Sequence, residues 1–217
     1  MATFKDGING PFRGKVGSVI GSKWRKVNYM KSLPRLNKKK RPPSPEQALV
    51  RKKFDLLNQF FRPISSVLEI GFQQFTAGAS GQNVAFSYNY DEAFIVEGDE
   101  VRLNYPALRL SHGSLANAGA ERAWLDDGVV HVTWHTKTYG LGGAPDDKAY
   151  ILLFNEASGY FGPTDDGVTR QSGQVALTDF DELAGPEQIH VWLFFVDAEG
   201  KRASKTVYIP VSEAPED

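Results

Sequence analysis

The chain has 217 residues and no cysteine, and this length can bury a sizeable core without disulfides. The absence of cysteine excludes a thiolate nucleophile, a cysteine-ligated zinc site and a redox pair. Hydrophobic residues make up 41% of the sequence and charged residues 24%, with 21 glycines and 12 prolines. This composition is typical of a globular protein with many turns.

The formal net charge of −1 conceals an uneven distribution along the chain. Residues 1–53 contain fifteen Lys and Arg against two Asp and Glu, a net of +13. Residues 54–217 contain ten against twenty-four, a net of −14. A strongly basic start is therefore followed by an acidic remainder, and each part favours partners of opposite charge.

We expect the protein to be made in the cytoplasm without a signal peptide. A secretory signal needs about 7–15 apolar residues after a basic start, and residues 1–26 contain only the interrupted stretch from Val16 to Gly21. The longest apolar run, Ile189–Val196, is far shorter than the roughly 20 residues of a membrane-spanning helix. We therefore predict no membrane span. An extracellular or particle-associated location would need a non-classical route.

Residues 1–43 are predicted to form a basic arm rich in Gly and Pro, because they contain too few large apolar residues to build a core. Within the arm, Lys15–Gly21 and Trp24–Leu33 are predicted to pair as a β-hairpin around Gly21-Ser22-Lys23. A poorly ordered basic tail is the alternative.

One face of the predicted hairpin would be nearly flat, because strand alternation places Gly17, Val19 and Gly21 on the same side. Glycines within a strand often mark the close approach of another backbone or sheet. The arm ends in a dense positive block followed by two prolines, which is typical of a linker. That block consists of Lys38, Lys39, Lys40 and Arg41.

Residues 44–98 are predicted to be a helical segment. Ser44 is a suitable N-cap, and apolar residues at three- and four-residue spacing predict a helix over Pro45–Phe61. A second helix over Ile64–Phe75 would complete a helical hairpin. Asn83–Phe94 has a weaker helical pattern.

From Asp99 onward the apolar residues recur with a period of two, which is typical of strands. Turn-forming residues such as Asp127-Gly128 separate these segments. The predicted strands are Glu100–Leu110, Val129–His135, Ala149–Asn155, Gly173–Leu177, Ile189–Val196 and Thr206–Val211. This pattern predicts an antiparallel β-sandwich domain over residues 99–217. The fold class is thus mainly β with a short helical segment.

Several motifs occur at fixed spacing across most of the chain. They are Gly10-Pro11-Phe12, Gly14-Lys15-Val16-Gly17-Ser18-Val19-Ile20-Gly21, Trp24-Arg25, Ser32-Leu33-Pro34, Ser87-Tyr88-Asn89 and Ser114-Leu115. Together they resemble an uncharacterised domain-of-unknown-function family common in Bacteroidota. The resemblance implies a C-terminal region similar to fibronectin type III or immunoglobulin-like domains. It implies no enzymatic activity, because the family has no known one. The chain departs from the family where Arg13-Gly14 directly follows Phe12, because a slightly longer glycine-rich stretch is expected there.

No sequence motif indicates catalysis. The surroundings of Gly14-Lys15 lack the residues of a phosphate-binding loop, and there is no Gly-x-Ser-x-Gly elbow. His131 and His135 would lie about 13 Å apart on one strand, which is too far to share a zinc ion. We interpret them as polar outer-face residues, with surface ligand binding as the alternative. A carboxylate pair for glycoside cleavage, whose members meet only in three dimensions, is an open alternative.

Three acidic pairs lie in predicted turns and lack the spaced carboxylates of a calcium loop. They are Asp126-Asp127, Asp146-Asp147 and Asp165-Asp166. We interpret them as turn residues, with calcium binding as the alternative. The sequence therefore predicts no enzyme, no cofactor and no metal site.

The leading hypothesis is a non-enzymatic structural protein that self-assembles into a filament or phage-like particle. Its arm would dock on a neighbouring subunit by strand addition, steered by opposite charges. The predicted docking and steering residues are Gly17, Val19, Gly21, Trp24, Arg25, Tyr29, Lys38, Lys39, Lys40 and Arg41.

Two alternatives involve other partners. In the first, the same arm binds the phosphates of a nucleic acid. In the second, the sandwich loops form a carbohydrate- or protein-binding module, with Tyr139, Tyr160 and Phe161 as candidate contact residues.

Overall fold

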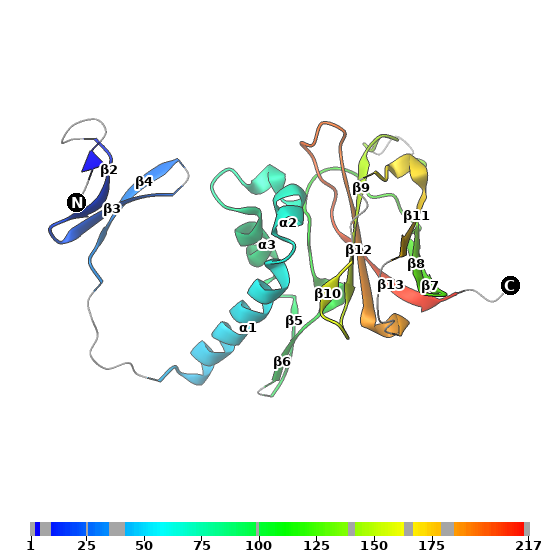
Figure 1. Ribbon diagram of the computed structural model, residues 1–217, viewed down its shortest axis with the longest axis horizontal. Helices are drawn as coiled ribbons and strands as arrows, with labels where there is room; N and C mark the ends of the chain where they lie inside the picture. Colours follow the sequence, from blue (N-terminus) through cyan, green and yellow to red (C-terminus); the bar gives the residue numbers. More distant parts are fainter. Residues whose placement is uncertain are drawn as a thin grey trace. The chain divides into compact units, whose positions relative to one another are not determined.

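The protein consists of two compact units, Met1–Ser44 and Pro45–Asp217. The computed structural model (Figure 1) describes residues 3–4, 10–24, 26–34, 42–98, 100–138, 142–162, 167–178 and 185–214. Among these residues, no helix is long and apolar enough to cross a membrane.

The N-terminal unit is a four-stranded antiparallel sheet in the order β1-β2-β3-β4 (Figure 1). Its strands are β1 (Thr3–Phe4), β2 (Phe12–Val16), β3 (Val19–Trp24) and β4 (Val27–Ser32). Gly17 and Ser18 form the turn between β2 and β3, and Gly17 adopts a φ of +57° that glycine tolerates without strain. The predicted hairpin turn at Gly21-Ser22-Lys23 is therefore wrong. Gly21 lies within β3, opposite Gly14 and Met30.

The second unit begins with three helices. They are α1 (Pro45–Phe61), α2 (Ser65–Gly71) and α3 (Gly81–Asn89), and a 3-10 turn, η1 (Gln73–Phe75), follows α2. The predicted bounds of α1 are confirmed. The predicted helix over Asn83–Phe94 starts two residues earlier, because the Ser80 hydroxyl accepts a hydrogen bond from the Asn83 N–H at 3.3 Å.

The third helix also ends earlier than predicted, and a buried side chain explains why. The Asn89 amide donates to the carbonyls of Ala85 and Arg109, and its Oδ1 accepts from the Arg109 N–H, each at 2.7 Å. These bonds hold the end of α3 against the segment that follows. The chain then forms a two-stranded hairpin of β5 (Phe94–Glu97) and β6 (Glu100–Leu103).

The rest of the unit is a seven-stranded sheet in the order β10-β9-β12-β13-β7-β8-β11. Its strands are β7 (Arg122–Asp126), β8 (Val129–Thr133), β9 (Lys148–Asn155), β10 (Tyr160–Phe161), β11 (Gln174–Thr178), β12 (Ile189–Val196) and β13 (Val207–Glu213). Short 3-10 turns connect some of the strands: η2 (Tyr105–Ala107), η3 (Arg170–Ser172) and η4 (Pro186–Gln188).

The mainly β, sandwich-like fold class is confirmed, with three corrections. The pairing of β13 with β7 is parallel, so the sheet is not entirely antiparallel. The predicted strand over Glu100–Leu110 ends at Leu103, because Pro106 lies in η2 and cannot donate to a strand ladder. Strand β7 was not predicted.

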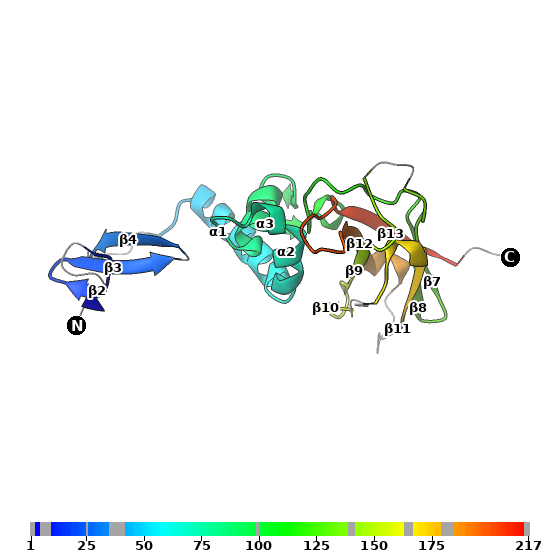
Figure 2. The same cartoon turned by 90° about the horizontal axis from the view of Figure 1, so that it is seen from above.

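The sheet has one apolar face that curls around a main core. Alternate residues of β8, β9 and β12 point into this core: Val130, Val132, Ile151, Leu153, Val191, Leu193 and Phe195. The opposite face of β9 and β12 packs against the helices, which lie on one side of the sheet in Figures 1 and 2. Strands buried on both faces are continuous apolar runs rather than alternating ones, as in β12.

The helices and the sheet therefore share a second core. Leu152 and Trp192 of the sheet pack in one cluster with Leu57, Phe60 and Phe72 of the helical segment. The predicted helical segment (residues 44–98) and the predicted β-sandwich domain (residues 99–217) thus lie almost entirely within one compact unit, Pro45–Asp217.

A charged pair is buried inside this unit. The Arg170 side chain is 0% exposed and that of Asp147 2%, and Arg170 Nε lies 3.1 Å from Asp147 Oδ2. Arg170 Nη2 donates to the Ala116 carbonyl at 2.7 Å, and the guanidinium lies 4.0 Å from the ring centre of Phe195. Asp147 also accepts from the Ala144 N–H at 2.8 Å. The pair thus joins three segments of the chain.

We expect Asp147→Ala to destabilise the protein by about 3–5 kcal/mol, because it leaves the Arg170 charge buried without its partner. Urea unfolding followed by tryptophan fluorescence measures this change. The matched control is Glu199→Ala, which removes the exposed Lys201–Glu199 pair and should change stability by less than about 1 kcal/mol. Equal effects of the two substitutions would contradict the structural role of the buried pair.

Candidate assembly interface

The register of the N-terminal sheet assigns its side chains to two faces. One face, called here the aromatic–cationic face, combines apolar and positively charged residues. Its members are Lys15, Ile20, Ser22, Trp24, Val27, Tyr29 and Lys31. Tryptophan and tyrosine thus lie on the same surface as two lysines.

The aromatic–cationic face is open to solvent. Trp24 is 53% exposed, Val27 63% and Tyr29 43%. All six residues of β4 are exposed. An antiparallel sheet usually covers at least one of its faces with a core, whereas the described residues of this unit leave this face exposed.

The opposite face is also largely open. Met30 is 71% exposed and Val16 44%. Phe12 provides the local cover on this side, because a Cβ atom added at Gly21 would lie 2.2 Å from the Phe12 carbonyl oxygen and 2.6 Å from its ring. The two chain segments can approach so closely only because residue 21 is glycine.

This geometry changes the predicted docking strand. Gly17 lies in a turn, and the space beside Gly21 is filled by Phe12 of the same unit. Val19 is half-buried, opposite Val16 and Ser32. Of the predicted residues that the structure describes, Trp24 on β3 and Tyr29 on β4 are the exposed side chains.

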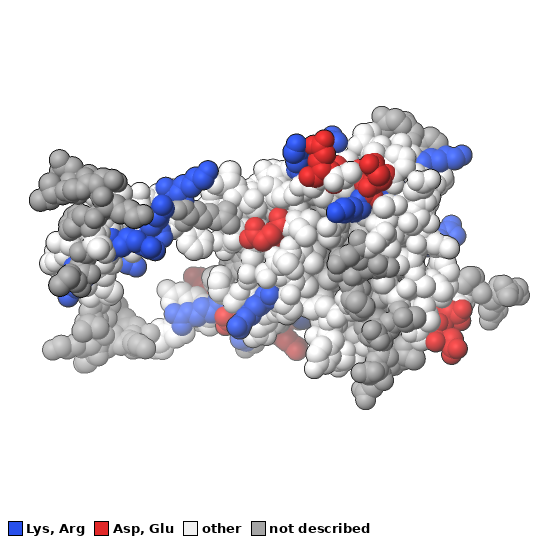
Figure 3. Space-filling view, turned by 45° about the horizontal axis from the view of Figure 1, so that its top comes forward, with Lys and Arg blue, Asp and Glu red and all other residues white. Residues whose placement is uncertain are grey.

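The described charges of the N-terminal sheet have one sign. They belong to Arg13, Lys15, Lys23, Lys26 and Lys31. In Figure 3 the coloured side chains of this unit are blue, whereas both signs are mixed over the second unit. The predicted residues Arg25, Lys38, Lys39, Lys40 and Arg41 lie outside the described residues.

Titratable side chains gather at one place in the second unit. His190 Nδ1 lies 2.9 Å from the Tyr208 hydroxyl, and His190 Nε2 lies 3.4 Å from Glu156 Oε2. The Tyr105 ring stacks on His190 with 4.1 Å between ring centres. Burial lowers the pKa of His190 although Glu156 acts in the opposite direction.

The tyrosines of this cluster are poor nucleophiles. Burial, and to a smaller extent the charge of Glu156, raise the pKa of Tyr105 to about 12 and also raise the pKa of Tyr208. Both phenols are therefore protonated at neutral pH, and the cluster is suited to hydrogen bonding between β12, β13 and η2.

Among the described residues, His131 of β8, His135 just after it and the acidic pairs do not form a metal site. No group of three or more His, Cys, Asp or Glu in the described part of the chain could hold a metal ion. His131 stacks on Trp124. Asp127 and Gly128 form a turn with φ values of +41° and +85°, and Asp165-Asp166 lie outside the described residues.

The aromatic residues predicted as contacts of a binding module are Tyr139, Tyr160 and Phe161. Tyr160 is 74% exposed. Phe161 packs against the core shared by helices and sheet. Tyr139 lies outside the described residues. These three residues therefore provide one exposed ring within the described structure.

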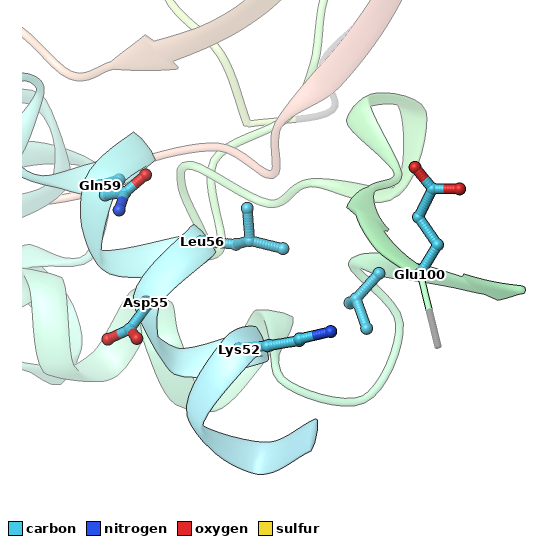
Figure 4. Close-up of a pocket in the computed structure, with 6 residues that line it drawn as sticks. Lys52, Asp55, Leu56, Gln59 and Glu100 are labelled. Atoms are coloured by element: carbon cyan, nitrogen blue, oxygen red, sulfur yellow. The ribbon is translucent and has the colours of Figure 1, made fainter. Parts of the chain in front are cut away.

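A hollow of ≈ 500 Å³ lies between α1 and β6 (Figure 4). Its lining residues are Lys52, Asp55, Leu56 and Gln59 of α1 and Glu100 and Val101 of β6. In Figure 4, Leu56 and Lys52 extend toward β6, whereas Asp55 points away from it. Its lining mixes cationic and anionic side chains without a common ligand chemistry, so we assign it no ligand.

Comparison with known proteins yields a family but no activity. The model of a family of unknown function, DUF6266, matches residues 11–210. This match confirms the resemblance to an uncharacterised family; the bacterial group and the opening motif stay predictions. No curated protein matches the sequence.

One solved structure has a weak likeness to the chain. It is the adhesin domain of Epf from Streptococcus pyogenes, with 17% identity and a TM-score of 0.33. The likeness covers 48% of this chain and 34% of that one. The chain therefore spans about a third of that structure, and no functional argument rests on it.

We expect Gly21→Ala to loosen the N-terminal sheet, because the added methyl group would overlap the Phe12 carbonyl. Overpacking of this kind costs about 1–3 kcal/mol. Limited proteolysis should then cleave within residues 10–34 about ten- to a hundredfold faster, if cleavage follows the open population. Ser22→Ala is the matched control on the same strand. An unchanged cleavage rate for Gly21→Ala would show that the sheet does not depend on this contact.

Proposed function

The chain belongs to the DUF6266 family, whose function is unknown, and we propose that it is a non-enzymatic subunit of a homopolymer such as a filament or phage-like particle. The N-terminal sheet of one copy docks on the second unit of a neighbouring copy. The observation that carries this proposal is the exposure of apolar side chains on both faces of the sheet.

The first argument is the incomplete core of the N-terminal sheet. Small sheets need one covered hydrophobic face to be stable in water. Here Trp24 and Val27 on one face and Met30 on the other are each more than half exposed. Complete burial of a valine or methionine side chain contributes about 1.5–3 kcal/mol. A partner that covers either face would therefore stabilise both the sheet and the complex.

The second argument is charge complementarity. Residues 1–44 contain twelve Lys and Arg against one acidic residue, a net of +11, and residues 45–217 contain thirteen against twenty-five, a net of −12. Each copy therefore has both a basic surface and an acidic one. Contacts between unlike surfaces are heterologous and can propagate into rings or filaments, and opposite charges accelerate the encounter.

The third argument is the presence of two open sheet edges. Strand β4 is the last strand of the N-terminal sheet, and β11 is the last strand of the seven-stranded sheet. Among the described residues neither strand has a partner on its outer side, and such edges are suited to strand addition. Pairing of β4 with β11 of a neighbouring copy would join the two sheets without any change in either fold.

We expect the double substitution Val27→Thr and Met30→Ser to weaken assembly by at least about tenfold, because it removes exposed apolar surface from both faces of the sheet. Light scattering at increasing protein and salt concentrations measures the mass. Tyr160→Ser, which changes an exposed ring of the second unit, is the control and should leave the mass unchanged. A wild-type chain that is monomeric under all these conditions would refute the proposal.

A second candidate function rests on the aromatic–cationic face. Trp24 and Tyr29 lie on the same face as Lys15 and Lys31. Aromatic rings that stack on bases, combined with cations that contact phosphates, are typical of surfaces that bind single-stranded nucleic acids. Nucleic acid would contact only the aromatic–cationic face of the sheet, whereas a neighbouring copy can contact either face.

If this face binds nucleic acid, Trp24→Ala should weaken binding of a single-stranded oligonucleotide about five- to a hundredfold. Electrophoretic mobility shifts at low salt measure the affinity, which should fall steeply as salt is added. Met30→Ala on the opposite face should have little effect. The absence of any shift at low salt would exclude the nucleic-acid function.

A further inference from the structure

The outer face of the seven-stranded sheet carries an aromatic ridge. Trp124 of β7 and His131 of β8 form a direct cross-strand pair. Their rings are stacked, with 5.3 Å between centres and an angle of 11° between planes. The neighbouring residues Ala123, Val130 and Val132 point to the opposite face and into the main core. The ridge therefore lies on the face of these strands that points away from the core, where a tryptophan is unusual.

Small residues flank the ridge on both sides. Trp124 is next to Ser212 of β13, and His131 is next to Ala176 of β11. In this row across four strands, two large side chains thus lie between two small ones. Because the flanking side chains are small, a hollow lies on each side of the stacked rings.

The two hollows are large enough for a small ligand. One has a volume of ≈ 540 Å³ and the other ≈ 410 Å³, within the range of about 300–1,000 Å³ that is typical of ligand sites. Trp124 and Thr133 line both, so the hollows adjoin each other. Together with the ridge they form a continuous surface across the strands β13, β7, β8 and β11.

A row of polar side chains runs beside the ridge. Thr133 of β8 is paired with Arg122 of β7 on one side and with Gln174 of β11 on the other. Each of these residues lies two positions along its strand from a member of the first row, which contains Trp124, His131 and Ala176. Within the described part of the chain, none of the side chains of Arg122, Thr133 and Gln174 has a hydrogen bond to another residue. They can therefore donate to and accept from a bound ligand without giving up existing bonds.

We propose that this surface binds a neutral oligosaccharide. The apolar C–H face of a pyranose ring would stack on Trp124, while its hydroxyl groups would bond to Arg122, Thr133 and Gln174. The open hollows on both sides suit a chain of several sugar units. Glu121 and Glu213 line the larger hollow together with one cation, Arg122. The net negative charge of this lining disfavours anionic sugars.

Sheet stability alone does not explain the surface. A stacked cross-strand pair such as Trp124–His131 also stabilises the sheet by about 0.2–1 kcal/mol. The two hollows and the unbonded polar row contribute nothing to that stability. The experiment must therefore separate ligand binding from folding.

The test titrates the full-length chain with cellohexaose, mannohexaose and chitohexaose, three neutral hexasaccharides, and follows the four tryptophan indole N–H signals by nuclear magnetic resonance. The Trp124 signal, assigned with Trp124→Phe, should shift with at least one hexasaccharide, whereas the signals of Trp24, Trp134 and Trp192 should not. Trp124→Ala should weaken binding by at least about tenfold.

Two further variants keep the aromatic ridge in place. Ala176→Leu fills the hollow beside His131 and should reduce affinity without removing any hydrogen-bonding group. Gln174→Ala should reduce affinity about two- to tenfold through loss of one hydrogen bond. Phe54→Ala, which removes a half-exposed ring of α1, is the matched control and should bind normally. Thermal unfolding of each variant shows whether the fold is retained.

Several results would overturn the proposal. These are the absence of a Trp124 shift with all three sugars at millimolar concentration, undiminished binding in a folded Trp124→Ala or Gln174→Ala variant, or preferential binding of a hexamer of galacturonic acid. A shift caused instead by a peptide of residues 10–34 of this chain would assign the surface to assembly and not to sugar. Strand β11 belongs both to this surface and to the proposed β4–β11 pairing. The titration is therefore done at a protein concentration at which light scattering shows single copies, so that failure of sugar binding and failure of self-assembly are distinguished.

Discussion

The burial of strands β9 and β12 on both faces is the constraint on which the second unit depends. One face of each strand closes the main core of the sheet, and the other closes the core that it shares with the helices. Leu152 and Leu153 are consecutive residues that belong to different cores. A helical layer that shares its core in this way cannot fold as an independent domain. The buried Arg170–Asp147 pair adds a second connection within this unit, because Arg170 also donates a hydrogen bond to the carbonyl of Ala116.

In contrast to β9 and β12, which are buried on both faces, the N-terminal sheet has exposed apolar side chains on both faces. It has the backbone pairing of a complete sheet but exposes Trp24, Val27 and Met30 on its two faces. The proposed docking on a second copy rests on these exposed faces, on the opposite charges of the two units and on the position of β4 and β11 at sheet edges. The Trp124–His131 ridge belongs to the second unit, and the polar row of Arg122, Thr133 and Gln174 beside it carries the proposed binding of sugar hydroxyl groups.

The candidate surfaces were partly predictable from the sequence. The basic charge follows from composition, and Trp24 and Tyr29 were among the predicted docking residues; their exposure comes from the structure. The role of Gly21 does not, because it depends on Phe12 lying across the strand. The ridge was missed because strand β7 was not predicted, although the Asp127-Gly128 turn already implied a strand before it. Alternation in that strand would then have placed Trp124 on the outer face.

The sequence by itself determined the local elements with strong periodicity or turn chemistry: the helix over Pro45–Phe61, the strand over Ile189–Val196 and the division into a basic and an acidic part. These properties depend on neighbours along the chain. Only the tertiary structure decided which strands pair, that the helices share a core with the sheet, and that Arg122, Thr133 and Gln174 form one row. These properties depend on register and packing between distant segments, which no local pattern encodes.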